Sequence, residues 1–306
     1  SLRPMARVAE PLRRMGAEVE TGANGLPPLR VLGRQLHGAE HHVDVASAQV
    51  KTAILVAALN ADGETAITTP SSRDHTERML GRLGVEIETG DTIRLTPPAR
   101  LPAFEMTVPG DPSSAAFWVV LAAAHPDAQV VVRNVCLNPT RAGFLAVLGR
   151  MGALVEMFDT REVAGEAVAD ILVKSAALRG TEVEAGEIPS LVDEVPVLAV
   201  AAAMAEGDSR FRGVGELRLK EVDRLAAITD QLARLGIDAK VEADDLLVSG
   251  AGRLQGGELR SGGDHRMAMS LAVAASLADG PSQLGGAAAA NVSYPDFFAE
   301  LRSLSD

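Results

Sequence analysis

The sequence "DEVPVLAVAAAMAEGDSRF", residues 193–211, decides the fold class. Every residue from Val195 to Met204 is apolar, so a helix formed there has no polar face to turn toward water. We therefore expect this helix to be buried on all sides. Two carboxylates, Asp193 and Glu194, stand at its head. The sequence thus predicts charged groups at the mouth of a buried helix.

Three further segments share this Ala-rich, apolar composition. They are "SAQVKTAILVAALNADGETAI" from Ser47, "SSAAFWVVLAAAHPDAQVVV" from Ser113 and "DHRMAMSLAVAASLADGPSQL" from Asp264. Most begin with Ser or Asp, which are common N-cap residues, and end near Gly or Pro. A short stretch with strand character follows most of them. We expect a buried helix in each copy.

A second class of segment is amphipathic and alternates with the first. These segments begin at Arg3, Arg73, Arg141 and Lys220. Apolar residues recur in them at helical spacing, then comes Leu-Gly or Met-Gly, then an alternating strand. The glycines, Gly16, Gly84, Gly152 and Gly236, fall one step past the predicted helices, where left-handed backbone geometry favours glycine.

The alternation repeats with a period of roughly seventy residues. Each repeat reads as strand, helix, strand, helix and further strand, which is a βαβαββ unit of an α/β fold. Helices that are apolar on every side must be enclosed by other parts of the protein. We therefore expect buried helices surrounded by sheet and by outer amphipathic helices, in a closed arrangement rather than an open solenoid.

Composition limits the classes of function. The chain has 306 residues, 47% of them hydrophobic, so two domains with large cores are expected. A net charge of −12 disfavours nucleic acid as a partner, because binding phosphate backbones requires a basic face. An apolar run of eighteen residues free of charge is absent, so no membrane span is predicted. The single cysteine, Cys136, suggests a reducing, cytoplasmic compartment.

The charged helix heads are candidates for binding anions. Helix N-termini present free N–H groups and the positive end of the dipole. Lys220 and Arg224 are four residues apart, so on a helix they share one face and could hold a phosphate or carboxylate. The alternatives are structural. Asp193 could be an ordinary N-cap, Lys220 and Arg224 a solvated face, and His265 a capping or packing residue.

Seven stretches, in order along nearly the whole chain, resemble one family of enzymes. They are "SAQVKTAILVAAL", "SSRDHTERML", "PGDPSSAAF", "LVDEVPVLAVAAAMAEG", "RLKEVDRL", "GGDHRMAM" and "SYPDFF". Together they are similar to EPSP synthase (3-phosphoshikimate 1-carboxyvinyltransferase). The resemblance implies a two-domain inside-out α/β barrel of repeated units that closes on its substrates. The stretch "TVPGDPSS" from Thr107 resembles the crossover between domains, which predicts domains 1–108 and 109–306 with a hinge near Val108–Pro109.

The family implies a reaction and its partners. The enolpyruvyl group of phosphoenolpyruvate would pass to the 5-hydroxyl of shikimate 3-phosphate, through a tetrahedral intermediate and with release of phosphate. A base must take the hydroxyl proton, and an acid must protonate the methylene carbon. The resemblance implies two small-molecule substrates and neither metal nor organic cofactor. We expect a monomer.

Residue roles follow from the same resemblance. The shikimate 3-phosphate contacts match Ser47, Ala48, Gln49, Ser72, Asp193 and Lys220. The phosphoenolpyruvate contacts match Arg3, Gln49, Arg224 and Arg266. Asp193 matches the proposed base and Glu221 the residue proposed for proton transfer. A position at a helix N-terminus would favour the ionised form of Asp193, which could then accept the hydroxyl hydrogen.

Departures from the family pattern lead to two alternatives. Ala48 stands where many members have a second serine, and no lysine precedes the closing Tyr294–Pro295 pair. The family's "K-S-x-S-x-R" stretch and its Gly-rich phosphate loop have no counterpart in these 306 residues. We therefore expect the chain as given to be incomplete for catalysis. The alternatives are a UDP-N-acetylglucosamine enolpyruvyl transferase and a non-catalytic fragment of the same fold.

Overall fold

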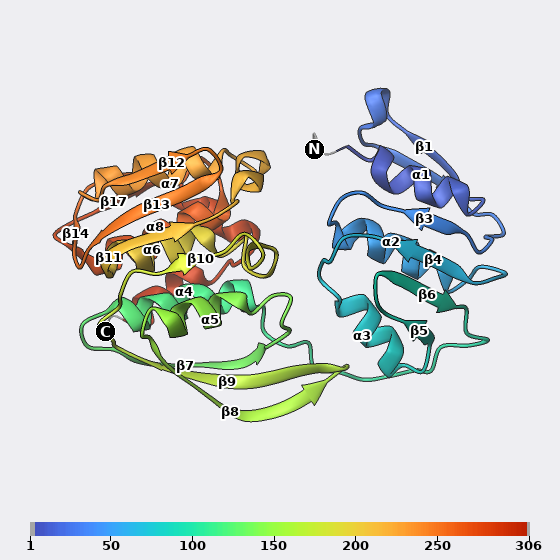
Figure 1. Ribbon diagram of the computed structural model, residues 1–306, viewed down its shortest axis with the longest axis horizontal. Coiled ribbons are helices and arrows are strands. Elements are labelled where there is room, and N and C mark those ends of the chain that lie inside the picture. Colours follow the sequence, from blue (N-terminus) through green and yellow to red (C-terminus); the bar gives the residue numbers. More distant parts are fainter. Residues whose placement is uncertain (1–3, 305–306) are drawn as a thin grey trace. The chain divides into compact units, whose positions relative to one another are not determined.

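The computed structural model describes residues 4–304, and it divides into two compact units. The first unit comprises the residues up to Val108 together with Glu162–Glu166, and the second comprises the remaining residues from Pro109 onward. The elements of each unit can be followed in Figure 1 by their labels.

The first unit is built on a four-stranded sheet in the order β3-β4-β6-β5, with a separate β1-β2 hairpin. Its α-helix α1 packs against α2 and β1, while α3 packs against β5. The bounds are α1 (Ala6–Arg14), β1 (Glu18–Thr21), β2 (Leu29–Leu32), β3 (Glu40–His42), α2 (Ala48–Ala58), β4 (Thr65–Thr68), α3 (His75–Arg82), β5 (Glu86–Glu88) and β6 (Thr92–Thr96).

The second unit contains a β7-β9-β8 sheet, apart from the Glu162–Glu166 turn between β8 and β9, which belongs to the first unit. It also contains a β10-β11-β13-β12 sheet and two parallel strand pairs, β14-β16 and β15-β17. The helices are α4 (Pro112–Ala124), α5 (Gly143–Arg150), α6 (Val195–Met204), α7 (Arg224–Arg234), α8 (His265–Leu277) and α9 (Phe297–Ser303). The strands are β7 (Gln129–Cys136), β8 (Leu154–Val163), β9 (Glu166–Lys174), β10 (Glu182–Val183), β11 (Glu206–Phe211), β12 (Ala239–Glu242), β13 (Asp245–Ala251), β14 (Leu254–Gln255), β15 (Glu258–Arg260), β16 (Ala278–Asp279) and β17 (Gln283–Gly285).

The predicted βαβαββ repeat is confirmed by strand order and direction. In β3-α2-β4-α3-β5-β6 the first two strands are parallel, and β6 lies between β4 and β5 and is antiparallel to both. The run β10-α6-β11-α7-β12-β13 has the same order and the same directions. In the repeat that contains α4, the first strand is reduced to a bridge between Gly110 and Val135. The chain therefore has the inside-out α/β fold class that its sequence indicates.

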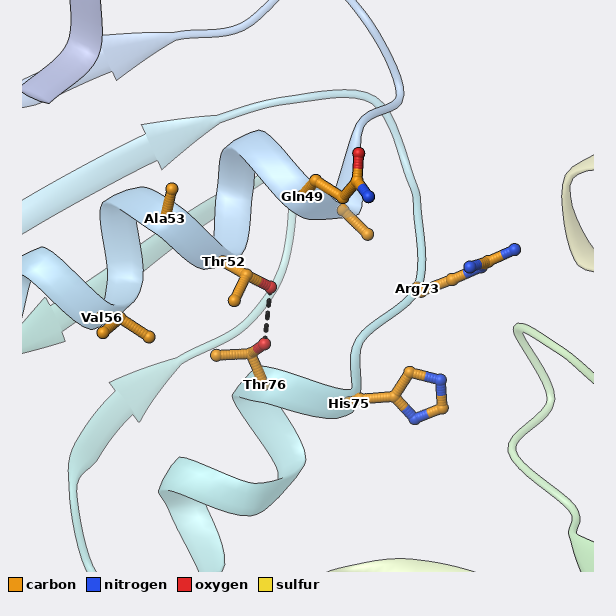
Figure 2. Close-up of a pocket in the computed structure, with 8 residues that line it drawn as sticks. Gln49, Thr52, Ala53, Val56, Arg73, His75 and Thr76 are labelled. Carbon is orange, nitrogen blue, oxygen red and sulfur yellow. Dashed lines mark hydrogen bonds between the residues drawn. The ribbon is translucent and has the colours of Figure 1, made fainter. Parts of the chain in front are cut away.

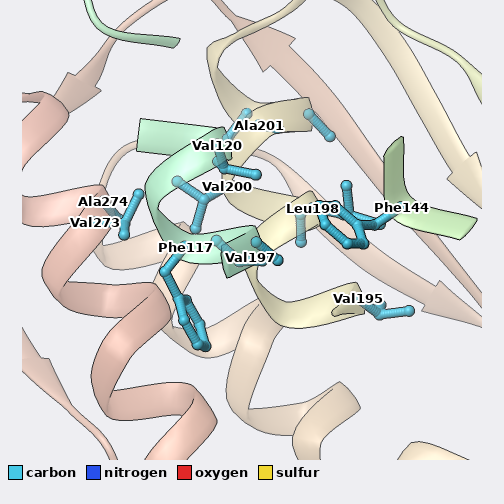
Figure 3. Close-up of a cluster of buried hydrophobic side chains, with 14 of the residues drawn as sticks. Phe117, Val120, Phe144, Val195, Val197, Leu198, Val200, Ala201, Val273 and Ala274 are labelled. Carbon is cyan, nitrogen blue, oxygen red and sulfur yellow. The ribbon is translucent and has the colours of Figure 1, made fainter. Parts of the chain in front are cut away.

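The centre of the second unit is made of the three Ala-rich helices α4, α6 and α8, which pack against one another (Figure 3). Every residue of α6 from Val195 to Ala203 is buried, as the opening stretch predicts. Val120 of α4, Val273 of α8 and Phe144 of α5 lie in the same cluster. Each such side chain contributes about 1.5–3 kcal/mol by leaving water.

The four glycines predicted to end the amphipathic helices have left-handed backbone geometry. Their φ angles are +96° at Gly16, +80° at Gly84, +92° at Gly152 and +81° at Gly236. Each follows one residue after the C-cap of α1, α3, α5 or α7. Because any other residue would be strained there, these positions stop the helices and turn the chain into the next strand.

Helix α2 differs from the expectation that every Ala-rich helix is buried all round. It buries one side, through residues such as Val50, Ile54 and Leu55, but Val56 is 51% exposed. In the second unit three apolar helices cover one another, whereas within the described residues α2 packs on the amphipathic α1 and also contacts the amphipathic α3. The predicted burial of α2 is therefore wrong for this structure.

Among the helices in residues 4–304, none has the length and apolarity needed to cross a membrane.

Candidate active site

The candidate residues fall into two groups, one in each compact unit. Ser47, Ala48, Gln49 and Ser72 belong to the first unit. Asp193, Lys220, Glu221, Arg224 and Arg266 belong to the second. Arg3, which the sequence assigns to phosphoenolpyruvate, lies outside the described residues.

In the first unit the head of α2 opens onto a pocket. Ser47 is the N-cap of α2, and its Oγ accepts a hydrogen bond from the Val50 N–H at 3.4 Å. Ala48 and Gln49 line the pocket together with apolar residues of α2 and the start of α3. In Figure 2 Gln49 stands at the same end of the pocket as Arg73 and His75. This end is therefore polar and the other end, at Val56, apolar.

Two buried interactions fix this pocket. The Lys51 ammonium forms an ion pair with the Glu77 carboxylate, and both side chains are almost fully buried. Thr52 and Thr76 share a hydrogen bond of 2.6 Å (Figure 2). Both contacts join α2 to α3, so the loop that carries Ser72 is held at a fixed position beside the head of α2. The Ser72 Oγ is buried and has no hydrogen-bond partner within the described residues.

In the second unit three cationic side chains surround the carboxylate of Asp193. Lys220 Nζ lies 3.8 Å and Arg224 Nη1 3.5 Å from Asp193 Oδ1, and Arg266 Nη2 lies 3.5 Å from Oδ2. Asp193 is not the N-cap of α6, because Glu194 occupies that position. Asp193 therefore belongs to a cluster of charged side chains and is not the N-cap of the helix.

Arg224 is the most enclosed charge of this group, with its side chain 1% exposed. Its Nε donates to Asp264 Oδ2 at 2.9 Å, and its Nη2 donates to Glu221 Oε2 at 2.8 Å. Asp264 is itself fully buried and caps α8 by accepting from the Arg266 and Met267 N–H groups. A guanidinium held by carboxylates on separate segments is not the solvated helix face that formed the structural alternative.

The expected helix beginning at Lys220 is wrong in its starting point. Helix α7 begins at Arg224, and Asp223 is its N-cap, accepting from the Ala226 N–H at 3.1 Å. Lys220 instead ends the short 3-10 turn Gly215–Leu219. Lys220 and Arg224 still meet at Asp193, because the turn between them brings their side chains to the same carboxylate.

Glu194 is a second carboxylate at the head of α6, and its side chain is 2% exposed. Its Oε1 accepts a hydrogen bond from Ser113 Oγ and lies 3.4 Å from Arg266 Nη1. Burial raises the pKa of Glu194, although the Arg266 charge and the Ser113 hydrogen bond act in the opposite direction.

The sequence reasoning missed the contributions of Glu194, Ser113 and Asp264 to this site. The sequence suggested Ser113 and Asp264 as helix starts. Asp264 is the N-cap of α8, whereas α4 is capped by Asp111 and Ser113 lies in its first turn. Both side chains also reach charged groups on other segments. One sequence feature could have revealed the role of Glu194. An acidic residue directly before an all-apolar helix will be buried with it, and a buried carboxylate needs a polar partner.

The arrangement in the second unit suits chemistry on anionic substrates. Lys220, Arg224 and Arg266 converge on one carboxylate, and Glu221 touches one of them and is 35% exposed. Cations held in a protected site can neutralise phosphate or carboxylate groups, and carboxylates beside them can move protons.

Comparison with known proteins identifies the class of protein. A sequence profile of the family described as "EPSP synthase (3-phosphoshikimate 1-carboxyvinyltransferase)" matches residues 1–301. An enolpyruvyl transferase, NikO from Streptomyces tendae, shares the fold with a TM-score of 0.75 at 20% identity, covering 100% of this chain and 72% of that chain.

Closer relatives narrow this class to one family. The 3-phosphoshikimate 1-carboxyvinyltransferase of Prochlorococcus marinus (strain MIT 9303) is 49% identical over 308 residues, covering 99% of this chain and 70% of the relative. That of Synechococcus sp. (strain JA-3-3Ab) is 50% identical over 307 residues, covering 99% and 69%. An EPSP synthase structure from Acinetobacter baumannii has a TM-score of 0.92 at 41% identity, covering 99% and 71%. The chain belongs to the EPSP synthase family.

Proposed function

We propose that this chain transfers the enolpyruvyl group of phosphoenolpyruvate to the 5-hydroxyl of shikimate 3-phosphate, releasing phosphate. The observation that carries the proposal is the cluster at the head of α6, in a chain that belongs to the EPSP synthase family. Three cations and two accessible carboxylates there match what two anionic substrates and two proton transfers require.

In the proposed addition step, Asp193 accepts the proton of the 5-hydroxyl while the hydroxyl oxygen bonds to the central carbon of phosphoenolpyruvate. Glu221 gives a proton to the methylene carbon, which becomes a methyl group. In the elimination step the deprotonated Glu221 takes a proton from the methyl group, the double bond forms again, and the bond from carbon to the phosphate oxygen breaks. The proton that Asp193 took from the hydroxyl goes to the departing phosphate. Phosphate departs, and the enolpyruvyl ether remains on the shikimate ring.

The cations have assigned partners in this scheme. Arg224 and Arg266 would hold phosphoenolpyruvate, and Lys220 would face shikimate 3-phosphate. The Arg224 guanidinium is enclosed and already contacts three carboxylates, so a substrate carboxylate would have to replace one of them. The contact between Nη1 and Asp193 is the longest of the three, so Asp193 would be the one replaced. Asp193 would then be released to act on the hydroxyl.

The first unit would supply the remaining contacts to shikimate 3-phosphate, from Ser47, Ala48, Gln49 and Ser72. The hydrogen bond that Ser72 Oγ lacks is consistent with a ligand oxygen as its partner. Gln49 would reach both substrates. We further propose a monomer in a reducing compartment such as the cytoplasm, and motion at the predicted hinge near Val108–Pro109.

A chimera tests the proposed function. Residues 1–306 replace the 308-residue matched stretch of the Prochlorococcus marinus relative, and phosphate release is followed with both substrates present. We expect phosphate release that needs shikimate 3-phosphate and phosphoenolpyruvate together. A chimera that releases phosphate with UDP-N-acetylglucosamine instead would favour the UDP-sugar alternative. A folded chimera without any turnover would favour the non-catalytic one.

Two variants of the chimera test the roles of the carboxylates. Asp193→Ala and Glu221→Ala are each expected to lower turnover about 100-fold or more, the usual effect of removing a proton-transfer group. Glu216→Gln is the matched control, because Glu216 also contacts Lys220 but is 63% exposed. Near-normal turnover in both alanine variants would refute the assigned roles.

A further inference from the structure

The buried carboxylate of Glu194 has a position that ordinary helix capping does not explain. Glu194 is the N-cap residue of α6, yet its side chain makes no capping hydrogen bond. It turns away from the helix end and toward α4 and α8, where Ser113 and Arg266 lie. Burying a carboxylate away from water is unfavourable unless its partners compensate, so Ser113 and Arg266 must offset the cost of burying Glu194.

On one side Glu194 is fixed by a chain of hydrogen bonds. Ser113, in the first turn of α4, donates from Oγ to Glu194 Oε1. Arg141 Nη2 in turn donates to Ser113 Oγ at 2.7 Å and to Asp111 Oδ1 at 2.7 Å. Asp111 is the N-cap of α4. The Glu194 carboxylate is therefore anchored to the start of α4 and has little freedom to move.

On the other side the same Oε1 atom faces Arg266. Arg266 Nη1 lies 3.4 Å from Glu194 Oε1 and 3.3 Å from the Asp193 carbonyl oxygen, while Nη2 lies 3.5 Å from Asp193 Oδ2. Three acceptors on two adjacent residues thus define the plane of the guanidinium. Arginine has many rotamers, and fixing them in advance lowers the entropy lost when an anion binds.

We propose that Glu194 is a positioning residue, whose Oε1 holds the Arg266 guanidinium in the orientation that binds phosphoenolpyruvate. The inference rests on the proposed role of Arg266 in the function above. It assigns Glu194 no contact with the substrate and no proton transfer. Ser113 and Arg141 act one step further back, by holding Glu194.

The expected effects separate positioning from packing. In the chimera, Glu194→Leu removes the acceptor and should raise the KM for phosphoenolpyruvate about tenfold, the effect of losing one hydrogen bond to a charged donor. The KM for shikimate 3-phosphate should stay within about twofold. Glu194→Gln keeps an oxygen at the same place and should leave both KM values within about threefold of the parent.

Val195→Ala is the matched control for packing. Val195 is adjacent, fully buried and apolar, so its truncation should lower stability without changing the KM for phosphoenolpyruvate. Should Glu194→Leu fail to fold, Glu194→Asp serves instead, because its shorter side chain withdraws the acceptor from Arg266. The same tenfold rise, about 1.4 kcal/mol, is expected for it.

A spectroscopic measurement on the 306-residue chain is independent of turnover. The arginine side-chain NMR signal of Arg266, assigned by its loss in Arg266→Gln, should shift or broaden in Glu194→Leu and stay in place in Glu194→Gln. An unchanged signal and an unchanged KM in Glu194→Leu would overturn the inference. Equal damage by Glu194→Gln would overturn it too. If the chimera is inactive, the proposed function fails, while the Arg266 signal still decides the positioning.

Discussion

Replacing Asp264 by alanine is expected to destabilise the second unit far more than the loss of an ordinary helix cap would. Asp264 is fully buried and serves two structures with one carboxylate. Its Oδ1 accepts from the Arg266 and Met267 N–H groups at the start of α8, and its Oδ2 accepts from Arg224 Nε at 2.9 Å. The alanine variant loses both functions at once.

The magnitude follows from these two contributions. Losing an N-cap side chain costs about 1 kcal/mol. Removing one partner of a buried ion pair costs about 3–5 kcal/mol, because the remaining charge stays buried. Arg224 keeps Glu221 and Asp193 as partners, which places the second contribution at its lower end. We therefore expect the free energy of unfolding to fall by about 4 kcal/mol.

The chain contains its own comparison. Asp223 caps α7 through the Ala226 N–H but is exposed, so Asp223→Ala should cost only about 1 kcal/mol. Asp264→Asn keeps an oxygen for the cap and loses the charge that faces Arg224, so it should fall between the two alanine variants.

Urea denaturation followed by tryptophan fluorescence measures these differences. Trp118 is the single tryptophan of the chain and lies in α4, 5% exposed and stacked on Phe297 at 4.9 Å between ring centroids. The signal therefore reports the unfolding of the second unit alone. If Asp264→Ala lowers the free energy of unfolding no more than Asp223→Ala does, the buried ion pair between Arg224 and Asp264 does not stabilise the second unit and the prediction is refuted.

Three further predictions concern packing, core and pH. Gly180→Ala would place a Cβ 2.1 Å from the backbone oxygen of Asp208 and should greatly reduce the yield of folded protein. In the control Gly186→Ala the new Cβ meets nothing within 4 Å, so this variant should fold normally by circular dichroism. Equal yields of the two variants would contradict the prediction. Phe297→Ala removes a fully buried ring and should cost about 3–5 kcal/mol in urea unfolding followed by circular dichroism, and a change below 1 kcal/mol would show that the site collapses. Burial raises the pKa of Glu194, so the stability that Glu194 contributes is present below its unfolded pKa of about 4.3 and is lost as pH rises through its folded pKa. Glu194→Gln should therefore gain stability relative to the parent as pH rises from about 4 to 7, measured by urea titrations. A constant stability difference between the two proteins would count against the raised pKa.

The sequence alone determined the repeat and its two kinds of helix. An apolar run such as Val195–Met204 can only be buried, and a glycine such as Gly152 ends a helix because of its own backbone freedom. Both signals are local, since they depend on the composition and conformation of a few consecutive residues. The motifs around Asp193 and Arg224 likewise indicated the family before any contact was known.

Only the tertiary structure decided how far each helix is covered and which charges meet. The composition of α2 resembles that of α6, but α6 packs between two apolar helices and α2 does not. Glu194 reaches Ser113, which is 81 residues away in the sequence, and Arg224 reaches Asp264, which is 40 residues away. The helix heads are brought together by packing of the helices behind them, and no local pattern of residues encodes such a contact.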